Sequence, residues 1–179
     1  MATIGIIRPA TAADAVACAA IYAPYVADTA ITFETQAPSV GEMAERIEAA
    51  LNRHAWLVLE VDDAVDGYAY AGPFKARDAY QWSCESTIYL RRGRRRTGAG
   101  RALYGELLAR LAERGYRRAV AVIAQPNEAS NGLHHALGFT DIGTFRKVGW
   151  KHGSWHDVAY LQLDLARGED PAAPPAPIS

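Results

Sequence analysis

The chain lacks several features that mark whole classes of proteins. Its 179 residues include only two cysteines, Cys18 and Cys84, which lie too far apart in the sequence to suggest a metal-ligand cluster. We expect both to be free thiols, as in a protein of the reducing cytoplasm. No apolar run approaches the roughly 20 residues of a membrane-spanning helix. Residues 1–9 also lack the basic and apolar segments of a signal peptide.

A strong excess of charge of one sign is missing as well. The 19 Lys and Arg residues nearly balance the 20 Asp and Glu residues, which gives a formal net charge of -1 at pH 7. This balance argues against a dedicated nucleic-acid binder. Half of the residues are hydrophobic, as in an ordinary globular protein. The length suits one α/β domain, and we expect a cytoplasmic protein with neither nucleic-acid nor membrane partners.

The apolar periodicity predicts alternating strands and helices. Strands are expected at residues 4–8, 56–61, 67–71, 83–90, 119–124, 141–149 and 155–165. Helices are expected to begin at Thr11, Ser39, Gly98 and Ser130. In the first helix the apolar stripe should be Val16, Ala19, Ala20 and Ala23, with an interruption at Pro24. This order of elements predicts a single mixed, mostly antiparallel sheet with helices on both faces.

The end of the chain differs from the rest in composition. Residues 168–179 contain four prolines and no periodic apolar pattern. We therefore expect one domain over residues 1–167, followed by a disordered Pro/Ala-rich tail.

The most informative segment is a strand that runs into a glycine-bearing turn and then a helix. Gly98 and Gly100 have no Cβ, so their backbone N–H groups can approach a ligand closely. The free N–H groups at a helix start, together with the helix dipole, favour an anion such as a pyrophosphate. Glycines that merely shape a tight connection remain an alternative. A dinucleotide fingerprint is excluded because Leu103 occupies its third glycine position, and the Gly-Lys-Ser/Thr of a P-loop is absent.

The sequence of this turn, Arg95-x-x-Gly98-x-Gly100, resembles the acetyl-CoA motif of the GNAT superfamily. Longer strings at residues 56–58, 69–80, 85–89 and 151–157 are similar to the phosphinothricin N-acetyltransferases. The resemblance implies an α/β GNAT fold that uses acetyl-CoA and no metal. It also implies a homodimer, and a substrate that is a small amino-acid analogue such as phosphinothricin, methionine sulfoximine or methionine sulfone.

The same resemblance assigns binding residues. The expected acetyl-CoA contacts are Ile88, Tyr89, Leu90, Arg95, Arg96, Thr97, Gly98, Ala99, Gly100, Asn127 and Ser130. The expected substrate contacts are Phe33, Lys75, Arg77, Tyr80 and Thr87. Two cations and a hydroxyl at this spacing suit a carboxylate or a tetrahedral oxyanion. The alternatives are a solvated polar loop at residues 75–80 and a core aromatic at position 33.

Glu85 is the candidate general base. It stands in an uncharged run, and strand alternation places it on one face with Thr87 and Tyr89, opposite Cys84. A carboxylate there is costly unless it is hydrogen-bonded or takes part in chemistry, and transfer to an ammonium group needs a base. A structural, salt-bridged glutamate is the alternative. The resemblance assigns the returning proton to His134, with Tyr89 as a competing donor.

Other features of the sequence suggest different functions. Arg91, Arg92 and the arginines at 94–96 could suggest RNA binding, although the net charge disfavours it. His152 and His156 are a poor ligand set for a metal. A protein N-terminal acetyltransferase and a non-catalytic acetyl-CoA-binding module remain open as alternative functions.

Overall fold

A single mixed sheet forms the centre of the computed structural model, which describes residues 5–93, 98–166, 168 and 176. Its strand order is β1-β2-β3-β4-β5-β7-β6. The strands are β1 (Ile6–Pro9), β2 (Trp56–Val61), β3 (Ala64–Pro73), β4 (Ser83–Leu90), β5 (Arg118–Ala124), β6 (Thr140–Lys151) and β7 (Ser154–Asp164). Strands β4 and β5 are parallel, and the other neighbouring strands are antiparallel. The predicted mixed, mostly antiparallel sheet is confirmed.

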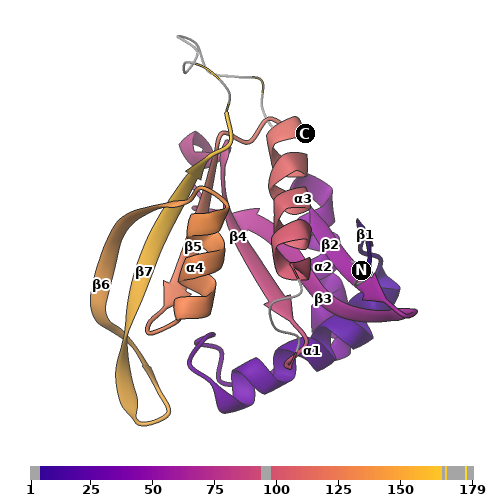
Figure 1. Cartoon of the computed structure of the whole chain (residues 1–179), viewed down its shortest axis with the longest axis horizontal. Helices are drawn as coiled ribbons and strands as arrows, with labels where there is room; N and C mark the ends of the chain where they lie inside the picture. Colours follow the sequence, from indigo (N-terminus) through magenta and orange to yellow (C-terminus); the bar gives the residue numbers. More distant parts are fainter. Residues whose placement is uncertain (1–4, 94–97, 167, 169–175, 177–179) are drawn as a thin grey trace.

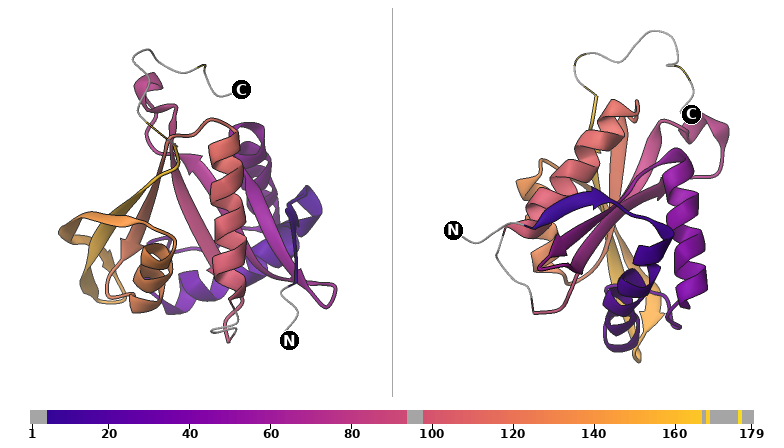
Figure 2. Two further views of the ribbon diagram at one scale, coloured as in Figure 1. Left: turned by 45° about the horizontal axis from the view of Figure 1, so that its top comes forward. Right: turned by 90° about the vertical axis from the view of Figure 1, so that its right-hand side faces the viewer.

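Helices cover both faces of the sheet. They are α1 (Ala15–Asp28), α2 (Val40–Arg53), α3 (Ala99–Glu113) and α4 (Glu128–Ala136), with short 3-10 turns η1 (Ala12–Asp14) and η2 (Asp78–Tyr80). Figure 2 shows α3 and α4 on one side of the sheet and α2 on the other. Each face has its own apolar core. Leu103, Leu107 and Leu111 of α3 fill one core, and Cys18, Met43 and Ile47 of α1 and α2 fill the other.

Helix α1 differs from its prediction. Its buried side chains include Cys18, Ile21, Tyr22 and Val26, whereas Val16 of the expected stripe is 63% exposed. Alanine fits either side of a helix, so the alanines of this segment gave no directional signal. Pro24 also does not interrupt the helix, which continues to Asp28. The missing N–H of Pro24 removes one backbone bond, and burial of the flanking Tyr22 and Val26 holds the helix together.

The remaining boundaries shift only slightly. Strand β3 extends further than predicted because Asp62 and Asp63 make a tight turn with φ of 50° and 60°, the left-handed pair typical of a two-residue hairpin. Helix α4 begins at Glu128 rather than Ser130. The predicted disordered tail lies outside the described residues, apart from Gly168 and Ala176. None of the helices described is both long and apolar enough to cross a membrane.

Strands β4 and β5 diverge, and this positions the site. They pair only through Ser83↔Arg118, Cys84↔Ala119 and Glu85↔Val120. Beyond Glu85, β4 continues its pairing with β3 as far as Leu90, while β5 continues its pairing with β7. Figure 1 shows the resulting opening between the two strands. One edge of the second half of β4 is therefore available to a ligand.

Candidate functional site

The turn before α3 is built for close approach to its backbone. Gly98 is the N-cap of α3 with φ of 78°, a left-handed conformation that favours glycine, and a Cβ added there would meet open space. Gly100 serves packing, because its added Cβ would lie 3.0 Å from Leu90 Cδ1. The backbone at the start of α3 thus follows a turn whose Gly98 leaves open space for a ligand. The predicted contacts Arg95, Arg96 and Thr97 lie outside the described residues.

Two arginines of the basic run have structural partners. Arg91 donates to Asp66 Oδ1 at 3.1 Å and to the Val65 carbonyl at 2.8 Å. Arg92 donates to Asp28 Oδ2 at 2.7 Å. These bonds tie the end of β4 to β3 and to α1. Both side chains are thus hydrogen-bonded to acidic residues of the same protein, which weakens the RNA-binding alternative.

The alternation predicted for β4 is confirmed. Ile88 and Leu90 pack against the core under α3, whereas Tyr89 packs on the opposite face with Tyr22 at 4.9 Å and Tyr25 at 5.1 Å between ring centroids. The Leu90 carbonyl accepts a hydrogen bond from Tyr25 Oη at 2.7 Å. Tyr25 of α1 therefore competes with a ligand for the last backbone carbonyl of β4.

Cys84 is fully buried under α3, and burial raises the pKa of its thiol to about 12. A thiol in that state on the face opposite Glu85 is a poor nucleophile.

Glu85 is half-buried at the point where β4 and β5 separate. Burial raises the pKa of its carboxyl group, and the nearby Lys75 ammonium opposes that shift. Among the residues described, none forms a hydrogen bond or an ion pair with this carboxylate. The salt-bridged structural role is therefore not supported, and the carboxylate is free to exchange a proton.

A polar group beside Glu85 was not predicted. Tyr70 lies opposite Thr87 in the β3–β4 register, and the nearby Thr87 hydroxyl acts to lower the pKa of Tyr70. Burial raises the pKa of Tyr70, whose other electrostatic neighbours are Arg46, Glu85 and Glu34. Strand alternation along β3 puts Tyr70 on the same face of the sheet as Glu85, so the sequence could have predicted its place. Nothing in the sequence pairs Arg46 with Glu34.

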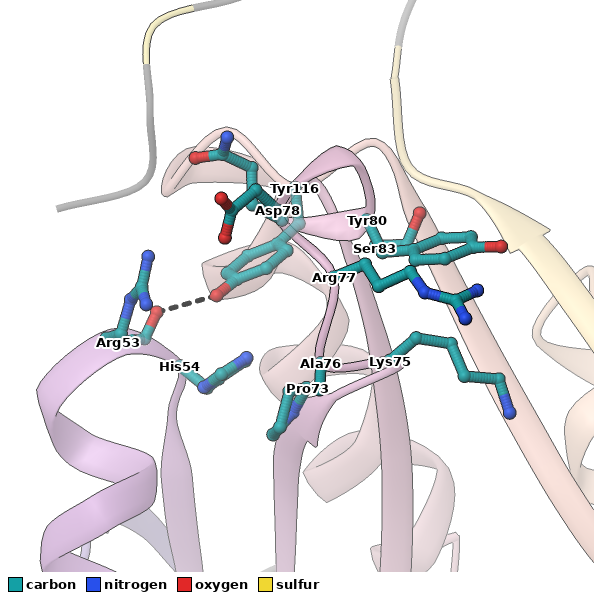
Figure 3. Close-up of a pocket in the computed structure, with 11 residues that line it drawn as sticks. Arg53, His54, Pro73, Lys75, Ala76, Arg77, Asp78, Tyr80, Ser83 and Tyr116 are labelled. Atoms are coloured by element: carbon teal, nitrogen blue, oxygen red, sulfur yellow. Dashed lines mark hydrogen bonds between the residues drawn. The ribbon is translucent and has the colours of Figure 1, made fainter.

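The expected substrate residues come together only in part. Lys75, Arg77 and Tyr80 line one pocket of about 320 Å³. The other lining residues are Arg53, His54, Pro73, Ala76, Asp78, Gln81, Ser83 and Tyr116. In Figure 3 the side chains of Lys75 and Arg77 extend to one side of the loop, away from Arg53, His54 and Tyr116. Thr87 and Phe33 are not among the lining residues. Thr87 lies further along β4, and Phe33 lies against Gly149 of β6.

His134 belongs to a buried hydrogen-bonded row. Its Nδ1 lies 2.7 Å from the Ser130 carbonyl, which can only accept, so Nδ1 carries the hydrogen. Burial lowers the pKa of His134, which keeps the ring neutral and leaves Nε2 to accept from Tyr104 Oη at 3.1 Å. Tyr104 Oη in turn lies 2.8 Å from Ser86 Oγ. The row crosses from α4 through α3 to β4, one residue beyond Glu85. Sequence reasoning missed Tyr104, whose position beside Leu103 resembles plain core.

Asn127 is the N-cap of α4. Its Oδ1 accepts from the Ser130 backbone N–H at 3.1 Å, which leaves the amide NH₂ for another partner. The structure therefore gives Asn127 a capping role, in addition to the acetyl-CoA contact predicted for it.

Within the described ranges, no three His, Cys, Asp or Glu side chains gather in a way that could hold a metal.

Comparisons with known proteins agree on one family. Residues 7–159 match the family described as acetyltransferase (GNAT) domain. The chain is 44% identical to a phosphinothricin N-acetyltransferase from Streptomyces viridochromogenes, over 96% of this chain and 92% of the relative. It is 33% identical to a methionine sulfoximine/methionine sulfone acetyltransferase from Salmonella typhimurium, over 95% and 98%. A crystal structure of a phosphinothricin acetyltransferase from Sinorhizobium meliloti in complex with acetyl-CoA superposes with a TM-score of 0.90. Its identity to this chain is 38%, over 97% of this chain and 94% of that one.

The Gly98 turn yields a direct test of the anion site. We expect Gly98→Val to weaken CoA binding at least about tenfold, because strain at a left-handed position and a branched side chain distort the turn. Isothermal titration calorimetry measures the affinity, and circular dichroism verifies the fold. Gly153→Val is the matched control, since Gly153 has φ of 74° and equally open space but lies in the β6–β7 turn. Equal CoA affinity in the Gly98 variant and the wild type would contradict the anion site.

Proposed function

Because the chain belongs to the GNAT family of acetyltransferases, we propose that it moves acetyl from acetyl-CoA to the α-amino group of a small amino-acid analogue. Phosphinothricin and methionine sulfoximine or sulfone are the proposed acceptor class. The observation that carries the proposal is Glu85, a half-buried carboxylate at the point where the central strands separate, with no hydrogen-bond or ion-pair partner among the residues that the structure describes. The names of the relatives support the choice of acceptor.

The residues present fit acetyl-CoA. The open turn at Gly98 and the start of α3 would hold the pyrophosphate, and the free edge of β4 at Ile88 and Tyr89 would pair with the pantetheine arm. The remaining amide NH₂ of Asn127 would bind the same arm. When bound, acetyl-CoA supplies an activated acetyl thioester. Arg95, Arg96, Thr97 and Ser130 remain predicted contacts.

Glu85 acts as the general base in this proposal. An α-ammonium group must lose a proton before it can attack, and a carboxylate whose pKa is raised by burial is better matched to that task at neutral pH. The Lys75 ammonium partly opposes that rise in pKa and so favours the ionised carboxylate. We propose direct transfer without a covalent acetyl-enzyme, since Cys84 is buried on the opposite face with a raised pKa.

The returning proton is assigned to the row Ser86–Tyr104–His134. In the resting row Tyr104 donates to His134 Nε2. To protonate the departing thiolate, the Tyr104 hydroxyl turns to donate to Ser86 Oγ while Ser86 gives its own hydrogen to the sulfur, and solvent then returns a proton to Tyr104. Burial raises the pKa of both Tyr89 and Tyr104, and Tyr89 is the weaker candidate because it packs against Tyr22 and Tyr25 on the opposite face of β4, outside this row. This assignment replaces direct donation by His134 with a relay.

The acceptor head group is assigned to Lys75, Arg77 and Tyr80. Two cations on one side of the β3–β4 loop favour an oxygen-rich anionic head, and Tyr80 adds a hydroxyl. A small pocket of this kind disfavours a protein N-terminus as acceptor. Phe33 and Thr87 are proposed to cover and orient the remainder of the substrate.

A homodimer and a cytoplasmic location remain predictions. The β6–β7 hairpin supports the dimer, because β6 is an edge strand and Phe145, Trp150 and Trp155 are each more than half exposed. Sedimentation velocity distinguishes a dimer from a monomer, and a monomer at micromolar concentration would contradict the first prediction.

The acceptor class is tested with a panel of amines. Phosphinothricin, methionine sulfoximine and methionine sulfone should be acetylated with a kcat/KM at least about tenfold above that of glutamate or methionine, since tetrahedral oxygen-rich heads suit the two cations. Release of CoA thiol measures the rate. Comparable kcat/KM values for lysine, peptide N-termini and these analogues would exclude the small-substrate assignment.

Glu85→Gln tests the general base. The variant should bind acetyl-CoA normally and lose about 10²-fold or more in kcat at pH 7. A base works only when deprotonated, so wild-type kcat/KM should rise with pH through the raised pKa of Glu85. In the variant only the titration of the amine remains, and the loss should shrink at high pH. Glu113→Gln, at an exposed position on α3, is the control. A wild-type pH profile in the Glu85 variant would reassign this residue to structure.

Two tyrosine-to-phenylalanine variants test the proton relay. Each removes one buried hydroxyl and leaves the ring in place. Tyr104→Phe should lower kcat by about tenfold or more because it cuts the row between Ser86 and His134, whereas Tyr89→Phe should change kcat by less than about threefold. The measurement is kcat at saturating concentrations of both substrates. The reverse ranking would assign the donor to Tyr89.

A further inference from the structure

A buried lysine joins two distant segments of the chain. Lys151, at the end of β6, is only 5% exposed, and its Nζ donates to the Thr32 carbonyl at 2.8 Å. Thr32 lies in the α1–α2 loop, residues 29–39. Figures 1 and 2 show this loop beside the end of the β6–β7 hairpin. A lysine on an exposed hairpin would ordinarily extend its ammonium group into water, so its burial against a backbone carbonyl indicates a specific connection.

The next residue of the loop makes a second contact with the hairpin. The Phe33 ring lies directly against the backbone of Gly149, where an added Cβ would overlap its Cε2 and Cζ atoms. The ring centroids of Phe33 and His156 lie 6.1 Å apart. Gly149 therefore makes room for Phe33, and the bond from Lys151 holds the neighbouring residue. We call this pair of contacts the loop–hairpin latch.

The α1–α2 loop is also attached to the face of the sheet that carries Glu85, Thr87 and Tyr89. Thr32 Oγ1 lies 2.6 Å from Tyr22 Oη, and the Tyr22 ring packs on Tyr89 of β4. The Glu34 carboxylate accepts two hydrogen bonds from Arg46, at 2.7 and 3.1 Å. Glu34 and Arg46 are also electrostatic neighbours of Tyr70, which lies opposite Thr87 in the β3–β4 register and is itself an electrostatic neighbour of Glu85.

The latch consequently spans the opening between β4 and β5. The loop belongs to the α1–α2 side of β4, whereas the hairpin follows β5 at the far end of the sheet. When Lys151 bonds to Thr32, the two sides are connected across the face that carries Glu85, Thr87 and Tyr89. Without this bond, the loop would keep the Phe33 contact and, at its start, the 3.2 Å contact between the Thr29 carbonyl and His152 Nε2.

We propose that Lys151 is a positioning residue for the acceptor, which acts by holding Thr32 and Phe33 against the β6–β7 hairpin and so closing the acceptor side of the opening. The inference rests on the proposed acetyl transfer. Lys151 itself touches neither substrate, and its effect passes through the loop. The latch makes the loop and the hairpin one wall of the acceptor site.

Lys151→Met removes the ammonium group and keeps the length of the side chain. Two measurements follow on the full-length protein. Hydrogen–deuterium exchange of the apo protein should be at least about tenfold faster at residues 29–36, because a buried bond to a charged group is lost. The KM for phosphinothricin should rise about tenfold, while the KM for acetyl-CoA should change by less than about twofold. Lys147→Met, an exposed lysine on the same strand, is the matched control.

Gly149→Ala provides a second route to the same latch. It keeps Lys151 but forces Phe33 away from the hairpin, so it should raise the acceptor KM in the same direction. This variant decides the question if Lys151→Met fails to fold.

The outcomes separate the latch from the reaction. Wild-type exchange in both variants would overturn the latch. Faster exchange with an unchanged acceptor KM would overturn the positioning role. A lower kcat together with higher KM values for both substrates would indicate that Lys151 is merely structural. That result would also overturn the positioning role. If the wild-type protein transfers no acetyl group to any amine, the proposed function and the positioning role fail together, while the exchange data still decide whether the latch exists.

Discussion

The separation of β4 from β5 after Glu85 is the constraint on which the rest of the structure depends. Three residue pairs hold the two parallel strands together, and beyond them each strand keeps only its outer neighbour. An open stretch of strand edge inside a sheet is normally costly, because its backbone groups lose their partners. Here it creates the passage that the site needs. Glu85 and Ser86 flank the point of separation, so the carboxylate and the Tyr104–His134 row meet there from opposite faces.

Other interactions hold the two strands apart in a defined way. Arg91 and Arg92 tie the end of β4 to β3 and α1, and Tyr25 binds the carbonyl of Leu90. On the other side, β7 pairs with β5 along seven consecutive register positions, from Arg118 to Ala124. Apart from the Leu90 carbonyl, which accepts from Tyr25, these contacts use none of the groups proposed to bind the acceptor or acetyl-CoA. The geometry of the passage is therefore a property of the folded chain itself.

Most of the fold could be predicted from the sequence because its signals are local. The capping box at Ser39 and Glu42 and the leucine stripe of α3 each specify an element without reference to a distant partner. The first helix was misread because alanine carries little directional information. Which side of that helix faces the sheet depends on which side chains pack against the sheet. Cys18 and Tyr22 do so, and this is visible only in the folded structure.

The candidate site divides in the same way. Glu85 and Gly98 stand out in the sequence because each breaks a local rule, one by placing charge on an apolar strand and the other by opening a helix with glycine. Tyr104, Arg46 and Lys151 obey local rules, and their roles arise from contacts across 30, 12 and 119 residues. Residues of that kind are visible only in the folded structure. The grouping of Lys75, Arg77 and Tyr80 in one pocket was predicted from the sequence. That Thr87 and Phe33 do not line this pocket was not predicted.

The presence of two separate cores has an evolutionary consequence. Under the proposed function, the core under α3 lies beneath the cosubstrate side and the core under α1 and α2 lies beneath the acceptor side, with the alternating side chains of β4 as their common boundary. A substitution that repacks one core leaves the other largely undisturbed. New acceptor preferences can therefore accumulate in the loop after α1 and in the residues beneath it, while recognition of the acyl donor is inherited intact. An architecture divided in this way allows one scaffold to diversify its amines without having to reinvent its chemistry.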